Sequence, residues 1–434
     1  MSTVTCGFSQ NVITPPGTGI FLDGYGHRMA PMTRVHDDLY VKTAVFSADH
    51  TEFFAIVVMD ILGVNAEIYT LLTDYIYLIT GLDRQHVSIC GTHTHSGPAG
   101  GMIDGLPINH DYWCHTAQIC ADTIREAMQG ACVCTCRTAI SDRKLLLSVN
   151  RRGRPFIDRR IKTVVFTGTD GRMRGVIATA CCHPVINTSL EMTADYPAVL
   201  TRRALEEYGV PFLFLQGSAG DINPHPDIMA DPERGMELLG NELADGIFSS
   251  AAKAGRSFDI PSVRSVFCYE KIPMKPFPDP DHAEKNLRDS VDQYTKLPWS
   301  LEKHYALRQL EWHRLIRQKA ASGESPDLSL PFQVFSVSEH ILFVFLPFEV
   351  MTATAQKLET FFTGLGYQPE NIFIISCSNS VSGYLVPVEE FAVGGYEVSG
   401  VAKWYGLPEF CENSEKAVID VVRHLTMTLK GGCL

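Results

Sequence analysis

The stretch Gly91-Thr92-His93-Thr94-His95-Ser96-Gly97-Pro98 decides how this chain is interpreted. It directly follows an apolar run, His86 to Cys90, which indicates a strand. At strand spacing, the rings of His93 and His95 point the same way. A polar pair at the carboxyl end of a strand, next to a Gly/Pro turn, lies where open α/β sheets bind ligands. We interpret this edge as a candidate active site; two ordinary loop histidines are the alternative for the motif taken alone.

Composition excludes several classes of protein. The 434 residues are 45% hydrophobic and 20% charged, which is typical of a globular chain with one large domain or two. A net charge of −12 without any Lys/Arg-rich run argues against nucleic acid as a partner. Met1 to Phe8 lacks the pattern of a secretory signal, and no apolar run approaches the roughly 18 residues that span a bilayer. We expect a cytoplasmic protein without a transmembrane segment.

The cysteine pattern favours reduced thiols. The 13 cysteines are odd in number, form no C-x-x-C pair, and several lie in apolar runs. Cys132, Cys134 and Cys136 would share one face of a strand, so a metal site there is an alternative. Buried cysteine more commonly behaves as a small hydrophobic residue, and we favour that interpretation.

Apolar runs alternate with helical patterns along the chain, which predicts an α/β fold with a multi-strand sheet core and flanking helices. The predicted strands are Thr43 to Ser47, Phe53 to Met59, His86 to Cys90, Thr163 to Thr167, Val176 to Cys181, Phe212 to Leu215, Ser262 to Tyr269, Ile341 to Leu346 and Ile372 to Ser376. The predicted helices are Ala66 to Thr80, Tyr112 to Met128, Pro197 to Tyr208, Gly235 to Ala252, Glu349 to Thr363 and Glu415 to Lys430. We expect a single domain over residues 1–434, with a helical insertion at about residues 276–326.

Polar residues recur where the predicted strands end. His183 follows the strand that begins at Val176, and Glu349 follows the one that begins at Ile341. Gly/Pro turns and, for Glu349, a favourable place in the first turn of a helix are the structural alternatives. Taken with His93, these residues predict a metal site of non-local ligands, because catalytic zinc takes three or four nitrogen or oxygen ligands and leaves room for water.

The chain resembles the neutral/alkaline ceramidase family, the zinc amidases that split ceramide into sphingosine and fatty acid. Thr92 to Pro98 is similar to the family's T-H-T-H-S-G-P signature, and Gly220 to Pro224 resembles its G-D-V-S-P motif. Further matches in order and spacing are Asn150-Arg151, His183, Glu349 after Leu346-Pro347, Gly383-Tyr384 with Tyr396-Glu397, and Gly24 to Arg28. They span most of the chain, so the resemblance implies the fold of the family's catalytic domain.

The resemblance also implies a site. Zinc would be held by His93, His183, Glu349 and Tyr384, with His95, Arg151 and Tyr396 around the scissile amide. A core tyrosine at a strand end is the alternative for Tyr384, and Arg152 offers a guanidinium as good as that of Arg151. Asp221 is expected to orient a ligand histidine.

The expected chemistry is hydrolysis of an amide by water that zinc activates. Zinc, His95 or Tyr396 would stabilise the oxyanion, and His95 is the first candidate for protonating the leaving amine. Asn223 stands where the family motif has serine, so a serine role is absent there, although asparagine can still donate a hydrogen bond. Ser218 is a poor substitute because Gln216 departs from the G-x-S-x-G pattern.

The substrate is the least determined expectation. Family members that act on ceramide resemble secreted or membrane-facing proteins with an additional C-terminal β-sandwich domain, whereas this chain ends soon after the helix predicted at Glu415 to Lys430. We therefore expect a hydrolase of a small-molecule or lipid-like linear amide, of undetermined oligomeric state. A metal-dependent esterase and a non-catalytic binding protein with the same fold are the alternatives.

Overall fold

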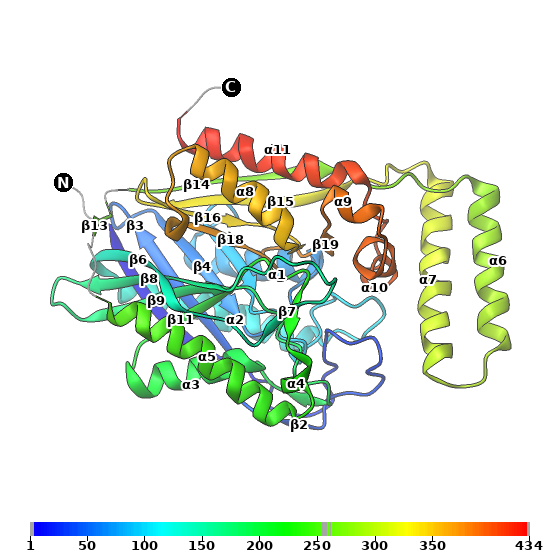
Figure 1. Cartoon of the computed structure of the whole chain (residues 1–434), viewed down its shortest axis with the longest axis horizontal. Helices are drawn as coiled ribbons and strands as arrows, with labels where there is room; N and C mark the ends of the chain where they lie inside the picture. Colours follow the sequence, from blue (N-terminus) through cyan, green and yellow to red (C-terminus); the bar gives the residue numbers. More distant parts are fainter. Residues whose placement is uncertain (1–3, 254–257, 261, 432–434) are drawn as a thin grey trace.

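Two sheets pack face to face and helices cover both outer faces, as seen in the computed structural model (Figure 1). The structure describes residues 4–253, 258–260 and 262–431. The α/β class with a large sheet and flanking helices, expected from the sequence, is confirmed; the second sheet makes the molecule a four-layer α/β/β/α arrangement.

The larger sheet has nine strands in the order β11-β9-β8-β6-β1-β3-β4-β5, with β13 beside β6. They are β1 (Thr5–Val12), β3 (Tyr40–Ser47), β4 (Phe53–Met59), β5 (Val87–Gly91), β6 (Cys132–Lys144), β8 (Arg160–Gly168), β9 (Met173–Ala180), β11 (Phe212–Gln216) and β13 (Phe258–Asp259). The pairs β4/β5 and β9/β11 are parallel, and the other pairs are antiparallel.

The smaller sheet has four strands in the order β14-β15-β16-β18. They are β14 (Val263–Ile272), β15 (Leu328–Val337), β16 (Ile341–Phe345) and β18 (Ile372–Ile375). Three short ladders lie outside the two sheets: β17 (Glu349–Val350) with β19 (Tyr384–Leu385), β7 (Ser148–Asn150) with β12 (Ile222–Pro224), and β2 (Arg34–Val35) with β10 (Glu191–Met192).

The core between the sheets explains why so many strands are continuously apolar. In β16, Ile341, Phe343 and Phe345 face the larger sheet, while the alternating residues Leu342 and Val344 face the outer helices. A strand that is buried on both faces needs apolar side chains at every position, as period-two alternation sends neighbours to opposite faces.

Six long helices cover the outer faces. α1 (Ala66–Thr80) and α2 (His110–Gln129) pack on β3 to β5, α3 (Tyr196–Glu207) and α5 (Pro232–Ala252) on β8, β9 and β11, and α8 (Thr352–Gly364) and α11 (Glu412–Leu429) on the smaller sheet. The helices predicted from the sequence are all present, with ends shifted by a few residues.

The segment expected to be helical between Pro276 and Pro326 contains two antiparallel helices, α6 (Pro280–Lys296) and α7 (Leu301–Ser322), which project from one side of the molecule (Figure 1). The short helices are α4 (Pro226–Met229), η1 (Pro369–Asn371), α9 (Val388–Phe391), the π-helix η2 (Tyr396–Gly400) and α10 (Ala402–Tyr405). Among the described residues, no helix is long and apolar enough to cross a membrane.

One predicted boundary is wrong in a way that matters for the site. The helix expected to start at Glu349 starts at Thr352, whose backbone N–H donates to the Asp221 carboxylate at 2.9 Å. Glu349 lies instead in β17, where it pairs with Tyr384 in register. It is therefore not a first-turn glutamate of a helix, and that structural alternative is excluded.

Candidate functional site

The two sheets meet at the carboxyl ends of their parallel strands. The Gly91 N–H donates to the Cys377 carbonyl at 3.1 Å, and the Ser376 N–H donates to the Gln216 carbonyl at 2.9 Å. These bonds join β5 and β11 of the larger sheet to the segment that follows β18 of the smaller one. Residues just beyond five strand ends are thereby brought to one place, as the strand-end pattern in the sequence predicted.

Three imidazoles converge at this place, and each is oriented by a backbone carbonyl. The Nδ1 atoms contact the carbonyl oxygens of Leu62 for His93 (2.8 Å), Gly24 for His95 (2.9 Å) and Ile222 for His183 (3.1 Å). A carbonyl oxygen only accepts, so each Nδ1 carries the hydrogen. The unprotonated atom of each neutral ring is then Nε2, and this is how ligand histidines are held in metal sites.

The Glu349 carboxylate lies against two of these rings. Its Oε2 is 2.8 Å from Nε2 of His183 and 3.2 Å from Nε2 of His93. All three side chains are at most 3% exposed. Lone pairs of two rings and a carboxylate oxygen directed at one another repel, unless a cation or a proton lies among them.

The electrostatics of the site couple Glu349 to His93. Burial lowers the pKa of the His93 imidazole, but Cys377 and Glu349 outweigh it and raise that pKa well above its usual value, so a proton on His93 is one positive charge that can face Glu349. Burial penalises a charged Glu349, but His93 and His183 outweigh it and hold the pKa of the carboxyl well below its usual value. Burial lowers the pKa of His95 well below the usual imidazole value, and the neighbouring histidines add to the effect. The site therefore contains a buried anion beside neutral His95, which favours a positive charge at this point.

The donor set fits a metal ion. Ring nitrogens of His93, His95 and His183 lie within 4.8 Å of one another, and the buried Nε2 atoms of His93 and His95 have no hydrogen-bond partner. The distances from Glu349 to the two rings are close to the roughly 3.3 Å between ligands of a tetrahedral zinc site with bonds of about 2.0–2.1 Å. The cluster therefore offers two overlapping ligand sets. One consists of His93, His95 and His183, and the other of His93, His183 and Glu349.

Two tyrosines from the expected site flank this cluster. The Tyr384 ring stacks on that of His183 with centroids 6.4 Å apart, and the Tyr396 ring meets Tyr384 edge-on at 6.1 Å. Burial, with the Glu349 charge, raises the pKa of both phenols. Both are therefore protonated at neutral pH unless a bound cation favours the phenolate.

Arg151 lies beside the cluster with its donors occupied. Its Nε donates to Glu397 at 2.9 Å, and its two terminal nitrogens donate to the Gly220 carbonyl at 2.7 Å and to Oδ1 of Asn223 at 3.3 Å. Its guanidinium carbon is 5.3 Å from the centre of the Tyr384 ring. Arg151 thus fixes the walls of the site, and the alternative Arg152 bonds to Glu390 and Glu397 farther out.

Asp221 lies close to the site but does not orient a histidine with its own side chain. It accepts hydrogen bonds from Asn150 at 2.7 Å and from the Thr352 backbone at 2.9 Å. The acceptor for the His183 ring is instead the carbonyl of the next residue, Ile222. The Asp221 side chain therefore holds Asn150 and the start of α8, and the group that orients His183 is the neighbouring backbone carbonyl.

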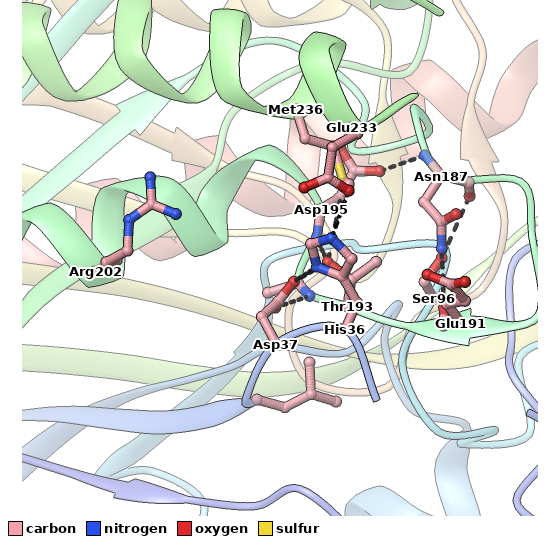
Figure 2. Close-up of polar contacts among 12 residues, drawn as sticks. His36, Asp37, Ser96, Asn187, Glu191, Thr193, Asp195, Arg202, Glu233 and Met236 are labelled. Atoms are coloured by element: carbon pink, nitrogen blue, oxygen red, sulfur yellow. Dashed lines mark hydrogen bonds and ion pairs between the residues drawn. The ribbon is translucent and has the colours of Figure 1, made fainter. Parts of the chain in front are cut away.

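A polar network supports the turn that contains the histidines (Figure 2). Asn187 donates to the Ser96 hydroxyl at 3.0 Å, and the Asp195 carboxylate accepts from the Asn187 backbone at 2.9 Å. Nearby, His36 bridges the carboxylates of Asp37 and Glu233 at 2.7 and 2.8 Å. The network ties the turn that ends at Ser96 to Asp195, which caps the N-terminus of α3.

Sequence reasoning missed two side chains at the site. The Tyr405 hydroxyl donates to Oε1 of Glu349, and Cys377 lies with its sulfur 3.2 Å from Nδ1 of His93. Neither belongs to a motif, and Tyr405 is 56 residues from its partner in sequence. The one usable signal for Tyr405 is its place in an aromatic pair, Trp404-Tyr405, shortly after Tyr396.

The fold and site together define a four-layer α/β protein with a buried histidine and carboxylate centre, and this architecture matches solved ceramidase structures. The neutral ceramidase from Pseudomonas aeruginosa aligns with a TM-score of 0.78 at 14% identity, over 100% of this chain and 76% of that one. A ceramidase complexed with C2 aligns with a TM-score of 0.75 at 14% identity, over 99% and 76%. No family model and no curated protein sequence matches the chain. The expected ceramidase-like fold is therefore confirmed, at an identity that establishes the fold alone.

Proposed function

We propose that this protein is a zinc-dependent hydrolase of linear N-acyl amides. The observation that supports it most is the convergence of three carbonyl-oriented imidazoles beside the Glu349 carboxylate. Nitrogen and carboxylate oxygen donors of this kind suit zinc. His93, His183 and Glu349 would hold the ion, with Tyr384 as a fourth ligand.

The zinc ion, when bound, would polarise the substrate carbonyl and lower the pKa of a water molecule at the site. The chain's own residues supply the proton transfers. The lowered pKa keeps the His95 ring neutral, and its buried Nε2 has no hydrogen-bond partner, so this nitrogen offers a lone pair to take a proton from the attacking water and return it to the leaving amine. The protonated phenol of Tyr396 would donate to the developing oxyanion.

Asn223 and Arg151 have supporting roles in this proposal. Because the Asn223 side-chain carbonyl accepts from Arg151, its amide N–H group is directed elsewhere and can donate to substrate. Arg151 holds Glu397 and Tyr384, and its positive charge makes a Tyr384 phenolate less costly. Asp221 keeps Asn150 and the start of α8 in place.

Metal content tests the first half of the proposal. Elemental analysis should find about one zinc per chain in the wild type. Folded His93→Ala and Glu349→Ala variants should bind zinc so weakly that most of it is lost on purification, while His282→Ala, at an exposed position on α6, should keep it. A wild-type protein that takes up no metal from zinc-containing medium would contradict the proposal.

A substrate panel tests the second half. Matched N-acyl and O-acyl compounds with short and long chains should show turnover of the amides, lost on removal of zinc. Turnover of the esters alone would mean that the protein is an esterase and not an amidase. Zinc binding with neither activity would identify a binding protein that has this fold.

A further inference from the structure

The carboxylate of Glu349 uses its two oxygens differently. Oε2 faces the Nε2 atoms of His183 and His93, whereas Oε1 accepts the hydrogen bond from the Tyr405 hydroxyl. A glutamate with both oxygens free can bind a metal through one or both of them. Here one oxygen is directed at the histidines and the other is already in use.

Tyr405 is well placed to keep that bond. Its ring packs against two buried apolar clusters, one of Leu62, Met102, Cys377 and Val381, and one of Met351, Tyr384, Val386 and Val401. The Tyr405 hydroxyl carries the hydrogen of this bond and acts as its donor. The partner oxygen has no hydrogen, so the bond has one direction only.

The backbone around Tyr405 is fixed as well. Tyr405 ends α10, and Gly406 follows with φ of +61°, a conformation that costs glycine little. The Trp404 carbonyl accepts from the Asp104 N–H at 2.6 Å, and the Trp404 ring meets Tyr305 of α7 edge-on at 5.3 Å. The two apolar clusters hold the Tyr405 ring, and the contacts of Trp404 hold the adjoining backbone. Together they determine where the hydroxyl lies.

We propose that Tyr405 is a positioning residue that reserves Oε1 of Glu349, so that the glutamate binds the metal through Oε2 alone. This inference rests on the proposed function, because it needs a metal at His93, His183 and Glu349. One-oxygen binding keeps the coordination number low and leaves a position for water and substrate, as catalytic zinc sites require. Partners that orient metal ligands in this way typically contribute 10–100-fold to metal affinity.

The test is the pair Tyr405→Phe and Tyr112→Phe. The first keeps the packed ring and removes only the bond to Glu349; the second removes a buried bond of similar kind, from the Tyr112 hydroxyl to the Ile13 carbonyl at 3.0 Å, away from the site. Zinc affinity is measured by competition with a chelator, and the absorption spectrum of the cobalt-substituted protein reports the coordination number. We expect Tyr405→Phe to bind zinc about tenfold or more weakly, with a cobalt spectrum shifted toward higher coordination. Tyr112→Phe should match the wild type in both.

A second comparison shows whether Tyr405 acts through Glu349. In a Glu349→Ala background, Tyr405→Phe should have no further effect on the residual zinc affinity, because its acceptor is gone. An additive loss would mean that Tyr405 acts by another route and would overturn the inference, as would wild-type affinity and spectrum in Tyr405→Phe itself. A wild-type protein that binds no metal would instead overturn the proposed function, and the inference with it.

Discussion

Gly24 shows how one residue can control a side chain of the candidate site. Its φ is +110°, and a Cβ added there would lie 2.6 Å from atoms of the His95 side chain. Its carbonyl is also the acceptor that orients the His95 ring. Only glycine satisfies both the backbone conformation and the close approach.

Gly24→Ala should therefore lower both stability and turnover. We expect a loss of about 2 kcal/mol or more in the free energy of unfolding, from left-handed strain and the contact with His95. Turnover should fall more than zinc content, since His95 is not among the proposed ligands. Gly19→Ala is the matched control, because Gly19 has a φ of +100° but open space around its Cβ position. Equal effects of the two variants on turnover would contradict the role assigned to Gly24.

The raised pKa of the buried Asp195 carboxyl should make the stability of the protein depend on pH. Burial raises the pKa of its carboxyl to about 6, although backbone N–H groups of Asn187, Tyr196 and Ile186 act in the opposite direction. A raised pKa means that the folded state binds the proton more tightly than the unfolded state, whose carboxyl has a pKa near 3.8. The contribution of Asp195 to stability is thus fully present below about pH 4 and is lost as the pH rises through 6.

Replacement by asparagine removes this dependence. Urea unfolding should show that Asp195→Asn costs about 1–1.5 kcal/mol more at pH 5 than at pH 7.5, relative to the wild type at each pH. The loss of backbone hydrogen bonds, which is independent of pH, cancels in this comparison. The same cost at both pH values would mean that the carboxyl does not titrate in this window.

The residues of the site were predictable only where a motif exposed them. His93, His95 and His183 follow apolar strands, and the register of those strands aims them at a common edge. The carbonyls that orient the rings belong to the backbone. Because every residue has one, the sequence does not indicate which carbonyl a ring will contact. Tyr405 was missed for a related reason, since its contact with Glu349 depends on tertiary packing alone.

At the scale of elements, the segment from α9 to α10 is the one that brings Tyr396 and Tyr405 over the histidines. It is attached to the Asn150–Arg154 turn mainly by charge. Arg152 bonds to Glu390 at 2.9 Å, to Glu397, and to the Gly394 carbonyl at 2.7 Å. The segment also contains a π-helix, an element that is frequent at functional sites.

Arg152→Gln should loosen this segment. Two glutamates that are at most 7% exposed would each lose one of two arginine partners, since Arg154 and Arg151 remain, and we expect a cost of about 1–3 kcal/mol in the free energy of unfolding. Hydrogen exchange should increase over residues 388–400, and turnover should fall while zinc content stays constant. Arg202→Gln, in an exposed pair with Glu237, should cost less than about 1 kcal/mol. Unchanged exchange over residues 388–400 would show that the segment is held by other contacts.

Uninterrupted apolar runs were predicted as strands, whereas two strands interrupted by polar residues or by a proline were missed. β4 and β16 are uninterrupted apolar runs, whereas β1 contains Ser9, Gln10 and Asn11 and escaped detection. β15 was missed because Pro331 interrupts it; that residue lies beyond the part paired with β16 and faces Tyr269 of β14 only. A proline is tolerated there because, among the described residues, one edge of β15 has no strand partner at this position, so the missing N–H leaves no ladder hydrogen bond unmade.

At the scale of the whole molecule, the site joins the two sheets, so the metal binding proposed here should be coupled to global stability. A ligand that binds only the folded state stabilises it by about 4 kcal/mol at a thousandfold excess over its Kd. Removal of zinc by a chelator should therefore lower the Tm of the wild type and make unfolding depend on zinc concentration. The Glu349→Ala variant should respond weakly to the same chelator. A wild-type Tm that is insensitive to chelator would place the metal outside the folded core.

Because the site takes residues from both sheets, the groups that form it are synthesised at widely separated times. Among the groups that build the site, the Gly24 carbonyl comes early in the sequence and the Tyr405 hydroxyl comes late. Both His93 and His183 leave the ribosome long before Glu349, and Glu349 leaves before the tyrosine that fixes it. A growing chain therefore exposes unpaired histidines while the smaller sheet is still missing. The centre is complete only after Tyr405 has been made, and shorter nascent chains contain its histidines without its geometry.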